Sequence, residues 1–158
     1  MDAGPLLNSV VAALAEVGLE AILIGNAAAA IHGAPVTTVD LDFMFRSTPV
    51  NLVKLKKFAG KMEAVILRPY YPASALFRLM NDDRGLQADF MPVIHGVKSF
   101  KSLRSRAARI ELAGRQLWVA ALADIIASKR AAGRPRDRAV LEILEKTLHE
   151  KAKSLSKA

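Results

Sequence analysis

Hydrophobic residues recur in the first part of the chain with spacings that change from helical to strand-like. Apolar residues three and four positions apart predict an amphipathic helix over residues 5–17, and Gly18 ends it. The continuous apolar run Ala21–Ile24 predicts a short strand that is buried on both faces. Gly25 and Asn26 interrupt this run, and the helix-prone residues 27–31 follow. The segment therefore predicts a strand, a glycine turn and a short helix in succession.

Residues 38–46 alternate between two kinds of side chain, which predicts a strand with two different faces. One face holds Val39, Leu41, Phe43 and Phe45, and the other holds Asp40, Asp42, Met44 and Arg46. Similar reasoning predicts further strands over residues 62–67, 75–80, 86–94, 109–112 and 116–119. It predicts further helices over residues 49–60, 97–103, 120–132 and 135–153. We expect an α+β fold with a mixed, twisted sheet, flanking helices and a C-terminal pair of helices.

Composition limits the class of protein. The chain has 158 residues, of which 52% are hydrophobic, so we expect one domain over residues 1–153 and a frayed tail over residues 154–158. The absence of cysteine excludes disulfides, zinc-thiolate sites and cysteine nucleophiles. The apolar stretch at residues 10–15 is too short to span a membrane, and Asp2 is the first charge, unlike the start of a signal peptide. We expect a cytoplasmic protein without a membrane anchor.

Charge is distributed unevenly along the chain. The net charge is +8, but residues 1–95 carry 8 Lys+Arg against 9 Asp+Glu, whereas residues 96–158 carry 15 against 6. A basic C-terminal third favours an anionic ligand or partner. The alternative is that these residues are solvated helix faces that only increase solubility.

Asp40 and Asp42 are the first candidates for chemistry. Residues i and i+2 of a strand lie on one face about 6–7 Å apart, where two carboxylates repel and raise each other's pKa. A divalent cation with oxygen ligands would relieve that repulsion. The alternative is that both residues lie at the solvated end of an edge strand.

The sequence around this pair favours the metal interpretation. Gly25 stands at a strand-to-helix turn, where the backbone can approach a phosphate and the helix start offers free N–H groups. A third carboxylate, Asp89, occurs in the alternating stretch 86–94 together with Gln87 and Met91. Three carboxylates on neighbouring strands could hold two Mg²⁺ ions for phosphoryl or nucleotidyl transfer.

These residues carry a resemblance to a known family. The stretch 22–45, with Gly25-Asn26, a short helix that ends in His32-Gly33, and Asp40-Leu41-Asp42, is similar to the DNA polymerase β-like nucleotidyltransferases. Residues 124–137 also resemble the C-terminal helical part of small stand-alone members, many of which belong to toxin–antitoxin or abortive-infection systems. From the first of these stretches to the last, the resemblance extends over about two-thirds of the chain, with unmatched sequence between them.

The resemblance implies roles for particular residues. Gly25 and Asn26 would contact the triphosphate, although Asn26 replaces the usual Ser or Gly. Asp40, Asp42 and Asp89 would be the catalytic carboxylates and would hold two Mg²⁺ or Mn²⁺ ions, with Asp89 as general base or orienting group. Lys129 and Arg134, in the stretch similar to the family's C-terminal helices, are expected on the nucleotide as well.

For the other candidate residues, either a structural role is expected or the ligand is undecided. We expect His32 to interact with a helix C-terminus, and the scattered His95 and His149 make a poor zinc case. Trp118 and Phe100 are expected in the core. Arg134 and Arg136 lie near a predicted helix N-terminus, where cations are unfavourable, so phosphate or an acidic partner is a candidate ligand.

Three functional hypotheses remain after this reasoning. The first is a metal-dependent nucleotidyltransferase that moves a nucleoside monophosphate from a triphosphate to an acceptor hydroxyl on a protein, a tRNA or a small molecule. The second is a catalytically weak or inactive member of the same fold that binds a protein or RNA partner. Asn26 favours this hypothesis, and so do Val36 and Val39, which are apolar at positions that are often basic in the family it resembles. The third is a small RNA-binding module, against which the absence of interleaved surface aromatics argues.

Overall fold

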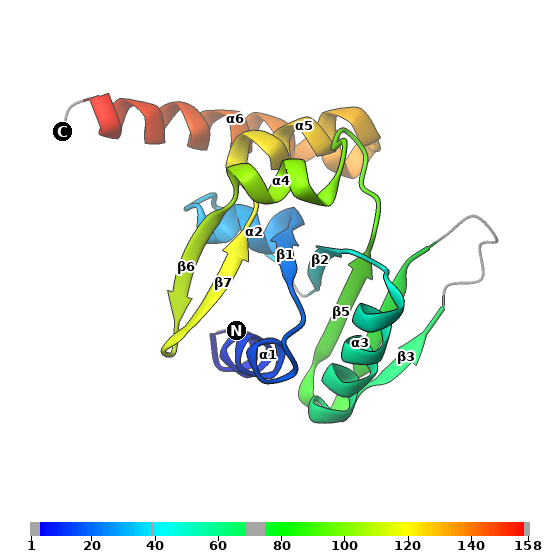
Figure 1. Cartoon of the computed structure of the whole chain (residues 1–158). Helices are drawn as coiled ribbons and strands as arrows, with labels where there is room; N and C mark the ends of the chain where they lie inside the picture. Colours follow the sequence, from blue (N-terminus) through cyan, green and yellow to red (C-terminus); the bar gives the residue numbers. More distant parts are fainter. Residues whose placement is uncertain (1–3, 39, 69–74, 157–158) are drawn as a thin grey trace.

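A seven-stranded sheet organises the protein, for which a computed structural model describes residues 4–38, 40–68 and 75–156 (Figure 1). The strands lie in the order β3-β4-β5-β2-β1-β7-β6. Their bounds are β1 Ala21–Ile24, β2 Leu41–Phe45, β3 Val65–Leu67, β4 Phe77–Asn81, β5 Leu86–Met91, β6 Ala108–Leu112 and β7 Arg115–Val119. Pairing is antiparallel except for β1 with β7 and β2 with β5, so the sheet is mixed, as predicted.

Helices surround this sheet and connect its strands. Their bounds are α1 Gly4–Val17, α2 Gly25–Ile31, α3 Pro49–Lys61, α4 Phe100–Arg106, α5 Leu122–Ala132 and α6 Pro135–Ser156, with a 3₁₀ turn at Asp82–Arg84. Thr48 caps α3, because its hydroxyl accepts a hydrogen bond from the Asn51 backbone N–H at 3.2 Å. Gly133 ends α5 in the left-handed conformation, so the chain turns at once into α6.

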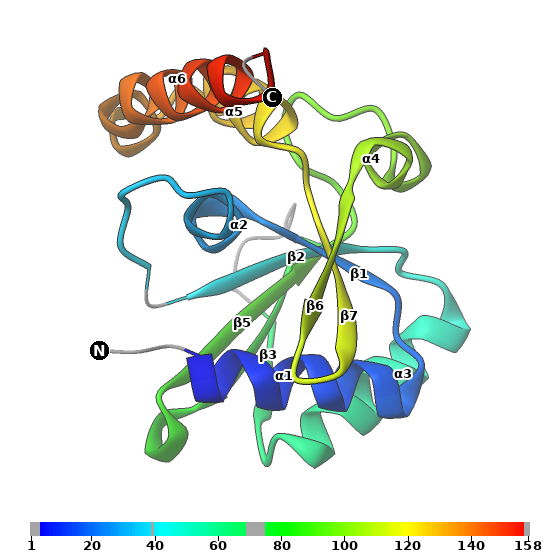
Figure 2. The same ribbon diagram turned by 90° about the vertical axis from the view of Figure 1, so that its left-hand side faces the viewer.

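The helices lie on different sides of the sheet. Helices α4, α5 and α6 gather at the top of Figures 1 and 2, whereas α1 lies at the bottom. Helix α1 packs on α3 and β7, while α2 lies on β1 and β2 and contacts α5. The C-terminal pair α5 and α6 pack extensively on each other, as predicted for the end of the chain. The α2–α5 contact brings the N-terminal glycine turn toward the basic C-terminal helices.

Aromatic rings fill the core beneath the central strands. Phe43, Phe45, Phe58 and Phe90 are fully buried, and the rings of Phe43 and Phe90 stack with centroids 4.9 Å apart. Met44 is also buried, although alternation placed it on the polar face of its strand. The reason is that both faces of β2 are covered at this point, because α2 packs on the strand and Phe43, Met44 and Phe45 are all buried.

Several predicted boundaries need correction. Strand β3 begins only at Val65, because α3 continues to Lys61 and Glu63 turns the chain with a positive φ of 53°. Strand β2 begins at Leu41, so Asp40 lies in a bend just before it, and the predicted Val39 is outside the described residues. Helix α4 lies at Phe100–Arg106 rather than residues 97–103, and α6 continues past residue 153 to Ser156. The last two residues of the predicted tail lie outside the described part of the chain.

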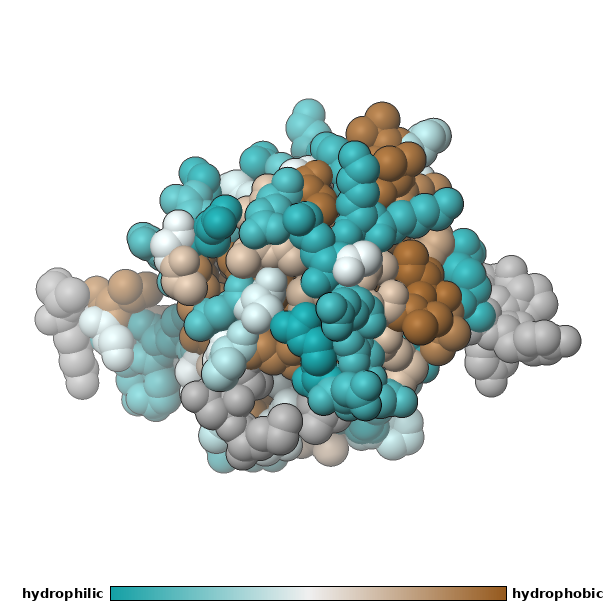
Figure 3. Space-filling model, turned by 90° about the horizontal axis from the view of Figure 1, so that it is seen from below, coloured by the Kyte–Doolittle hydropathy of each residue, from teal (hydrophilic) through white to brown (hydrophobic). Residues whose placement is uncertain are grey.

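The surface seen from below is mostly hydrophilic, with separate hydrophobic patches (Figure 3). Among residues 4–38, 40–68 and 75–156, no helix combines the length and apolar character that crossing a bilayer requires.

Candidate active site

Two neighbouring strands, β2 and β5, bring Asp42 and Asp89 together next to the end of β1. In the sheet register, Ile24 at the end of β1 pairs with Asp42 of β2, and Asp42 pairs with Asp89 of β5. Asp42 and Asp89 line the same cleft, so they share one face of the sheet, as the alternation predicted. Asp40, which precedes β2, is not among the residues that line this cleft, although its charge acts on Asp42.

Gly25 occupies a position that a larger residue would not fit. Its φ is +69°, which side chains other than glycine rarely adopt, and a Cβ atom would lie 2.9 Å from Oδ2 of Asp42. The Asp42 carboxylate therefore packs directly on the backbone at the start of α2. This contact joins the glycine turn and the Asp-x-Asp strand into one surface.

We expect Gly25→Ala to displace the Asp42 carboxylate, because the new methyl group would collide with it. Gly85→Ala is the matched control, since Gly85 has nearly the same φ of +67° but no atom within 4 Å of an added Cβ. Both variants should lose about 1 kcal/mol of unfolding free energy from backbone strain, measured by denaturant titration. Only Gly25→Ala should also weaken Mg²⁺ and nucleotide binding; equal binding by both variants would contradict this role.

The surroundings of Asp42 raise the pKa of its carboxyl group. Burial, followed by the negative charges of Asp89 and Asp40, raises the pKa of Asp42 to about 6. The positive charges of Lys129 and Arg136 act in the opposite direction and do not compensate. A carboxylate in this state favours a cation beside it.

Asp89 has a cationic partner that the sequence did not predict. Arg78 of β4 is its register neighbour, and the guanidinium donates from Nε to Oδ1 at 2.9 Å and from Nη2 to Oδ2 at 3.1 Å. The Asp89 side chain is only 9% exposed. Asp89 therefore has both oxygens in a bidentate ion pair, a geometry that arginine favours. The pair also raises the pKa of Arg78.

The opposite wall of the cleft carries the basic residues. Lys129 of α5 and Arg134 and Arg136 of the α5–α6 corner line the same cavity of about 630 Å³ as Asp42 and Asp89. Burial lowers the pKa of Lys129, although the charge of Asp137 opposes this. Arg136 makes no ion pair with any residue of the described ranges. The cleft therefore places carboxylates on the sheet and cations on the helices.

A buried carboxylate holds part of this basic wall in place. Asp137 is 1% exposed and accepts hydrogen bonds from Nε of Arg134 at 2.6 Å, from Nη2 at 3.2 Å and from the Arg134 backbone N–H at 3.2 Å. Lys129 Nζ lies 3.8 Å from Oδ1 of Asp137. Burial acts to raise the pKa of Asp137, but Arg134 and Lys129 outweigh it and hold that pKa below its ordinary value.

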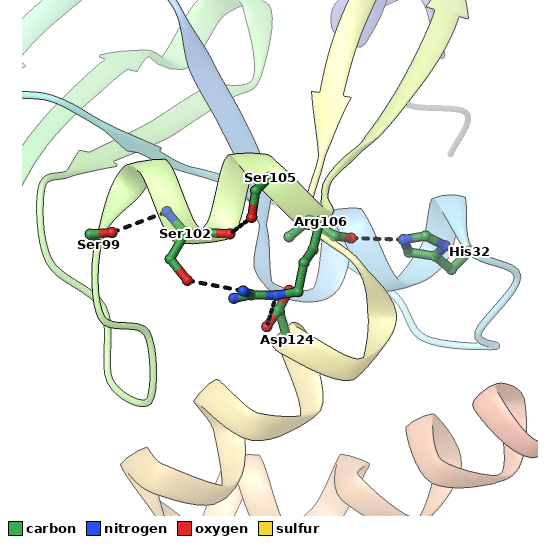
Figure 4. A network of polar contacts seen from close by, with 7 residues as sticks. His32, Ser99, Ser102, Ser105, Arg106 and Asp124 are labelled. Atoms are coloured by element: carbon green, nitrogen blue, oxygen red, sulfur yellow. Dashed lines mark hydrogen bonds and ion pairs between the residues drawn. The ribbon is translucent and has the colours of Figure 1, made fainter.

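A polar network fixes α5 relative to α4 (Figure 4). Arg106 of α4 donates from Nε to both oxygens of Asp124 on α5, at 3.1 and 2.9 Å, and from Nη1 to Oγ of Ser102 at 2.9 Å. Because Asp124 also lines the cleft, this pair supports the cleft wall next to Lys129. The ion pair between Arg130 and Glu145 adds a link between α5 and α6.

Comparison with solved structures decides the fold. No protein-family model and no curated protein matches the sequence. The antibiotic-resistance factor ANT(2'')-Ia, crystallised in complex with adenylyl-2''-tobramycin, matches with a TM-score of 0.65 at 16% identity, over 96% of this chain and 92% of that chain. The chain has the nucleotidyltransferase fold. A proposed nucleotidyltransferase from Thermotoga maritima matches with a TM-score of 0.58 at 16% identity, over 97% and 89% of the two chains.

A third similar structure is JHP933 from Helicobacter pylori, with a TM-score of 0.56 at 18% identity, over 90% of this chain and 64% of that one. At these identities the likeness establishes the nucleotidyltransferase fold, and activity needs evidence from the site itself.

The nucleotidyltransferase fold implies a divalent cation, and the described residues fit it in part. Asp40 and Asp42 make no side-chain ion pair or hydrogen bond within the described ranges, and their mutual repulsion would be relieved by a cation with oxygen ligands. Asp89 does not fit while Arg78 binds both of its oxygens. Accordingly, no group of three His, Asp or Glu residues in those ranges is arranged to hold a metal ion.

The remaining candidates from the sequence have distinct environments. Asn26 opens α2 next to Gly25, and its Oδ1 is buried without a hydrogen-bond partner in the described part of the chain, so this side chain still offers a free acceptor. His32 follows the end of α2; Nε2 contacts the Ala120 carbonyl at 2.8 Å and Nδ1 contacts Lys151 Nζ at 2.8 Å. The His32 ring therefore has structural partners, but they are a carbonyl just before α5 and a side chain of α6 rather than the predicted helix C-terminus. Burial and, to a smaller extent, the charge of Lys151 lower the pKa of His32, whereas the contact with the Ala120 carbonyl acts to raise it.

Sequence reasoning missed three residues: Arg78 and His95, which line the cavity, and Asp137, which holds Arg134 and Lys129 in place. Phe100 is buried, as predicted. Trp118 is partly buried, with the guanidinium groups of Arg104 and Arg109 at 4.4 and 5.1 Å from its ring centroid. A ring covered in this way is not a free stacking platform.

Proposed function

We propose that the chain is a divalent-metal-dependent nucleotidyltransferase. The observation that carries the proposal is the contact of Gly25 with Asp42, opposite the wall of Lys129, Arg134 and Arg136. A triphosphate fits between these two walls because its negative charges would face the three cations. The carboxylates would lie at its α-phosphate end.

The transfer itself would be a single displacement at phosphorus. The hydroxyl oxygen of an acceptor attacks the α-phosphorus and forms a new P–O bond, while its O–H bond breaks and the proton passes to solvent, or to Asp89 if one Asp89 oxygen leaves Arg78. The bond from the α-phosphorus to the oxygen that bridges to the β-phosphate breaks, and pyrophosphate leaves. A cation held by Asp40 and Asp42 would neutralise charge that develops on the phosphates.

The residues of the chain have separable tasks in this reaction. Arg136 and Lys129 bind the triphosphate, and Asp137 keeps Arg134 and Lys129 in position. Asp89 would orient or deprotonate the hydroxyl only if one of its oxygens leaves Arg78. Gly25 provides space for the carboxylate of Asp42.

Transfer of label from triphosphates with ³²P in the α-phosphate tests the proposal. The chain is incubated with each nucleotide, Mg²⁺ and separated protein, tRNA and small-molecule fractions of a cell extract. We expect Mg²⁺-dependent label in one of these fractions with the wild type and none with Asp42→Asn. Nucleotide binding without label in any fraction would refute the transferase proposal.

One observation favours a second candidate, a binding protein on the same fold without transferase activity. The bidentate bond of Arg78 to Asp89 occupies a carboxylate that the resemblance assigns to metal. Such a protein would bind a protein or RNA partner and would label no acceptor. The toxin–antitoxin setting implied by the sequence resemblance stays a prediction, because the similar structures do not bear on it.

We expect Arg136→Gln to weaken triphosphate binding roughly tenfold, which corresponds to about 1.4 kcal/mol. Its side chain is exposed, so the free energy of unfolding should change by less than about 0.5 kcal/mol. Arg138→Gln is the control, because Arg138 is also an exposed arginine of α6 but does not line the cleft. Isothermal titration checks both; equal weakening by the two variants would indicate a general charge effect.

Arg134 is less suitable than Arg136 for testing triphosphate binding by substitution. Its ion pair with the buried Asp137 means that Arg134→Gln would lower stability as well as binding.

A further inference from the structure

The pairing of β4 with β5 fixes the position of Arg78 in the cleft. Arg78 lies on β4 opposite Asp89, in a register fixed by the pairs Phe77–Phe90 and Leu79–Ala88 on either side. Leu79, Ala88 and Phe90 are fully buried, so a shift of this register would expose the core. The guanidinium is thus held beside Asp89 by the sheet itself.

The charge of Arg78 reaches all three carboxylates. Besides its two hydrogen bonds to Asp89, the negative charges of Asp40 and Asp42 act on the guanidinium and contribute to its raised pKa. Arg78 therefore supplies a permanent positive charge in contact with Asp89 and near enough to act on Asp40 and Asp42. A guanidinium cannot lose this charge at physiological pH.

A second divalent cation would need oxygen ligands from Asp89. Mg²⁺ requires short bonds of about 2.0–2.1 Å in octahedral geometry, and both Asp89 oxygens already accept from Arg78. Among the residues described, Asp40 and Asp42, by contrast, form no ion pair, although the charges of Lys129 and Arg136 act on Asp42.

We propose that the Arg78 guanidinium takes the place of one divalent cation, so that the cleft binds a single ion, at Asp40 and Asp42. The inference rests on the proposed function for the presence of a metal and departs from the two ions that the sequence predicted. In this arrangement Arg78 neutralises Asp89, and the divalent cation neutralises the other two carboxylates.

Counting bound Mn²⁺ tests this proposal without measuring transfer. Free Mn²⁺ is followed by its paramagnetic resonance signal during titration of the chain with a non-hydrolysable triphosphate present. We expect one tightly bound ion in the wild type and two in Arg78→Gln, because the amide leaves Asp89 free to bind metal. Arg84→Gln is the control, since Arg84 lies in the β4–β5 turn, outside the cleft, and should keep one ion.

A second variant guards against misfolding of Arg78→Gln. Arg78→Lys keeps the positive charge, so we expect it to fold and to retain a count of one. Two ions in the wild type, or one ion in a folded Arg78→Gln, would overturn the proposal. Failure of the transferase proposal has a different signature: the Mn²⁺ counts follow this pattern, but no acceptor is labelled.

Discussion

Asp42→Asn is expected to abolish nucleotide transfer and, at the same time, to stabilise the metal-free protein by up to about 3 kcal/mol at pH 7. Activity is lost because an amide is a poor ligand for a divalent cation. Stability rises because burial and the charges of Asp89 and Asp40 disfavour the ionised carboxylate in the fold. Loss of function with a gain in stability is typical of a residue retained for chemistry.

The pH dependence of this gain has a definite sign. The pKa of Asp42 is about 6 in the folded chain against an ordinary value of 3.8, so the folded state binds a proton more tightly. Wild-type stability should therefore fall, relative to the variant, as pH rises from about 4 to about 6, and stay level above that range. Below pH 4 both proteins carry a neutral side chain, and the difference should disappear.

Denaturant titration between pH 3.5 and pH 8 measures this difference. Asp83→Asn is the control, because Asp83 lies in the exposed 3₁₀ turn away from the cleft. It should change the unfolding free energy by less than about 0.5 kcal/mol at any pH. A strongly destabilised Asp42→Asn, or a gain that does not depend on pH, would assign Asp42 a structural role.

The second large effect is expected at Asp137. Asp137→Ala removes the partner of Arg134 and of the partly buried Lys129 and the acceptor of the Arg134 backbone N–H, so we expect a loss of about 2–4 kcal/mol. Glu142→Ala is the control, because Glu142 forms an exposed pair with Lys146 on the same helix. That pair should contribute about 0–1 kcal/mol.

Asp137→Asn separates the helix cap from the charge. The amide oxygen still accepts from the Arg134 backbone N–H, but the ion pairs are lost, so an intermediate loss of stability is expected. Because the folded pKa of Asp137 is below its ordinary value of 3.8, the stabilisation is present above that value and is lost as pH falls through the lower, folded pKa. A loss below about 1 kcal/mol in Asp137→Ala at pH 7 would contradict the role of a buried positioning residue.

The parts of the site that sequence could predict are those set by local spacing. Gly25 follows a strand directly, so the turn follows from the chain itself. Asp42 lies on a strand, as alternation predicted, whereas Asp40 lies in a bend just before that strand. The same alternation placed Asp89 on the correct face of β5. These predictions needed only the period of a strand and the conformational freedom of glycine.

The parts that sequence missed depend on pairing between distant segments. Arg78 meets Asp89 because β4 and β5 pair in one register across a 3₁₀ turn, which the residues alone did not specify. Asp137 could have been found, since an acid three residues after Arg134 at a helix start is half of a capping box. Its burial, which makes it a support for Lys129, follows only from the packing of α5 on α6.

The most direct test of the proposed site is a crystal structure of the chain with a non-hydrolysable nucleoside triphosphate and Mn²⁺. We predict the triphosphate in the cleft, with its phosphates facing Lys129 and Arg136 and its α-phosphate beside Asp42. One Mn²⁺ should lie on Asp40 and Asp42, with Arg78 still bound to Asp89. A nucleotide bound elsewhere, or a cleft that stays empty at saturating nucleotide and Mn²⁺, would contradict the assignment of this cleft as a nucleotidyl-transfer site.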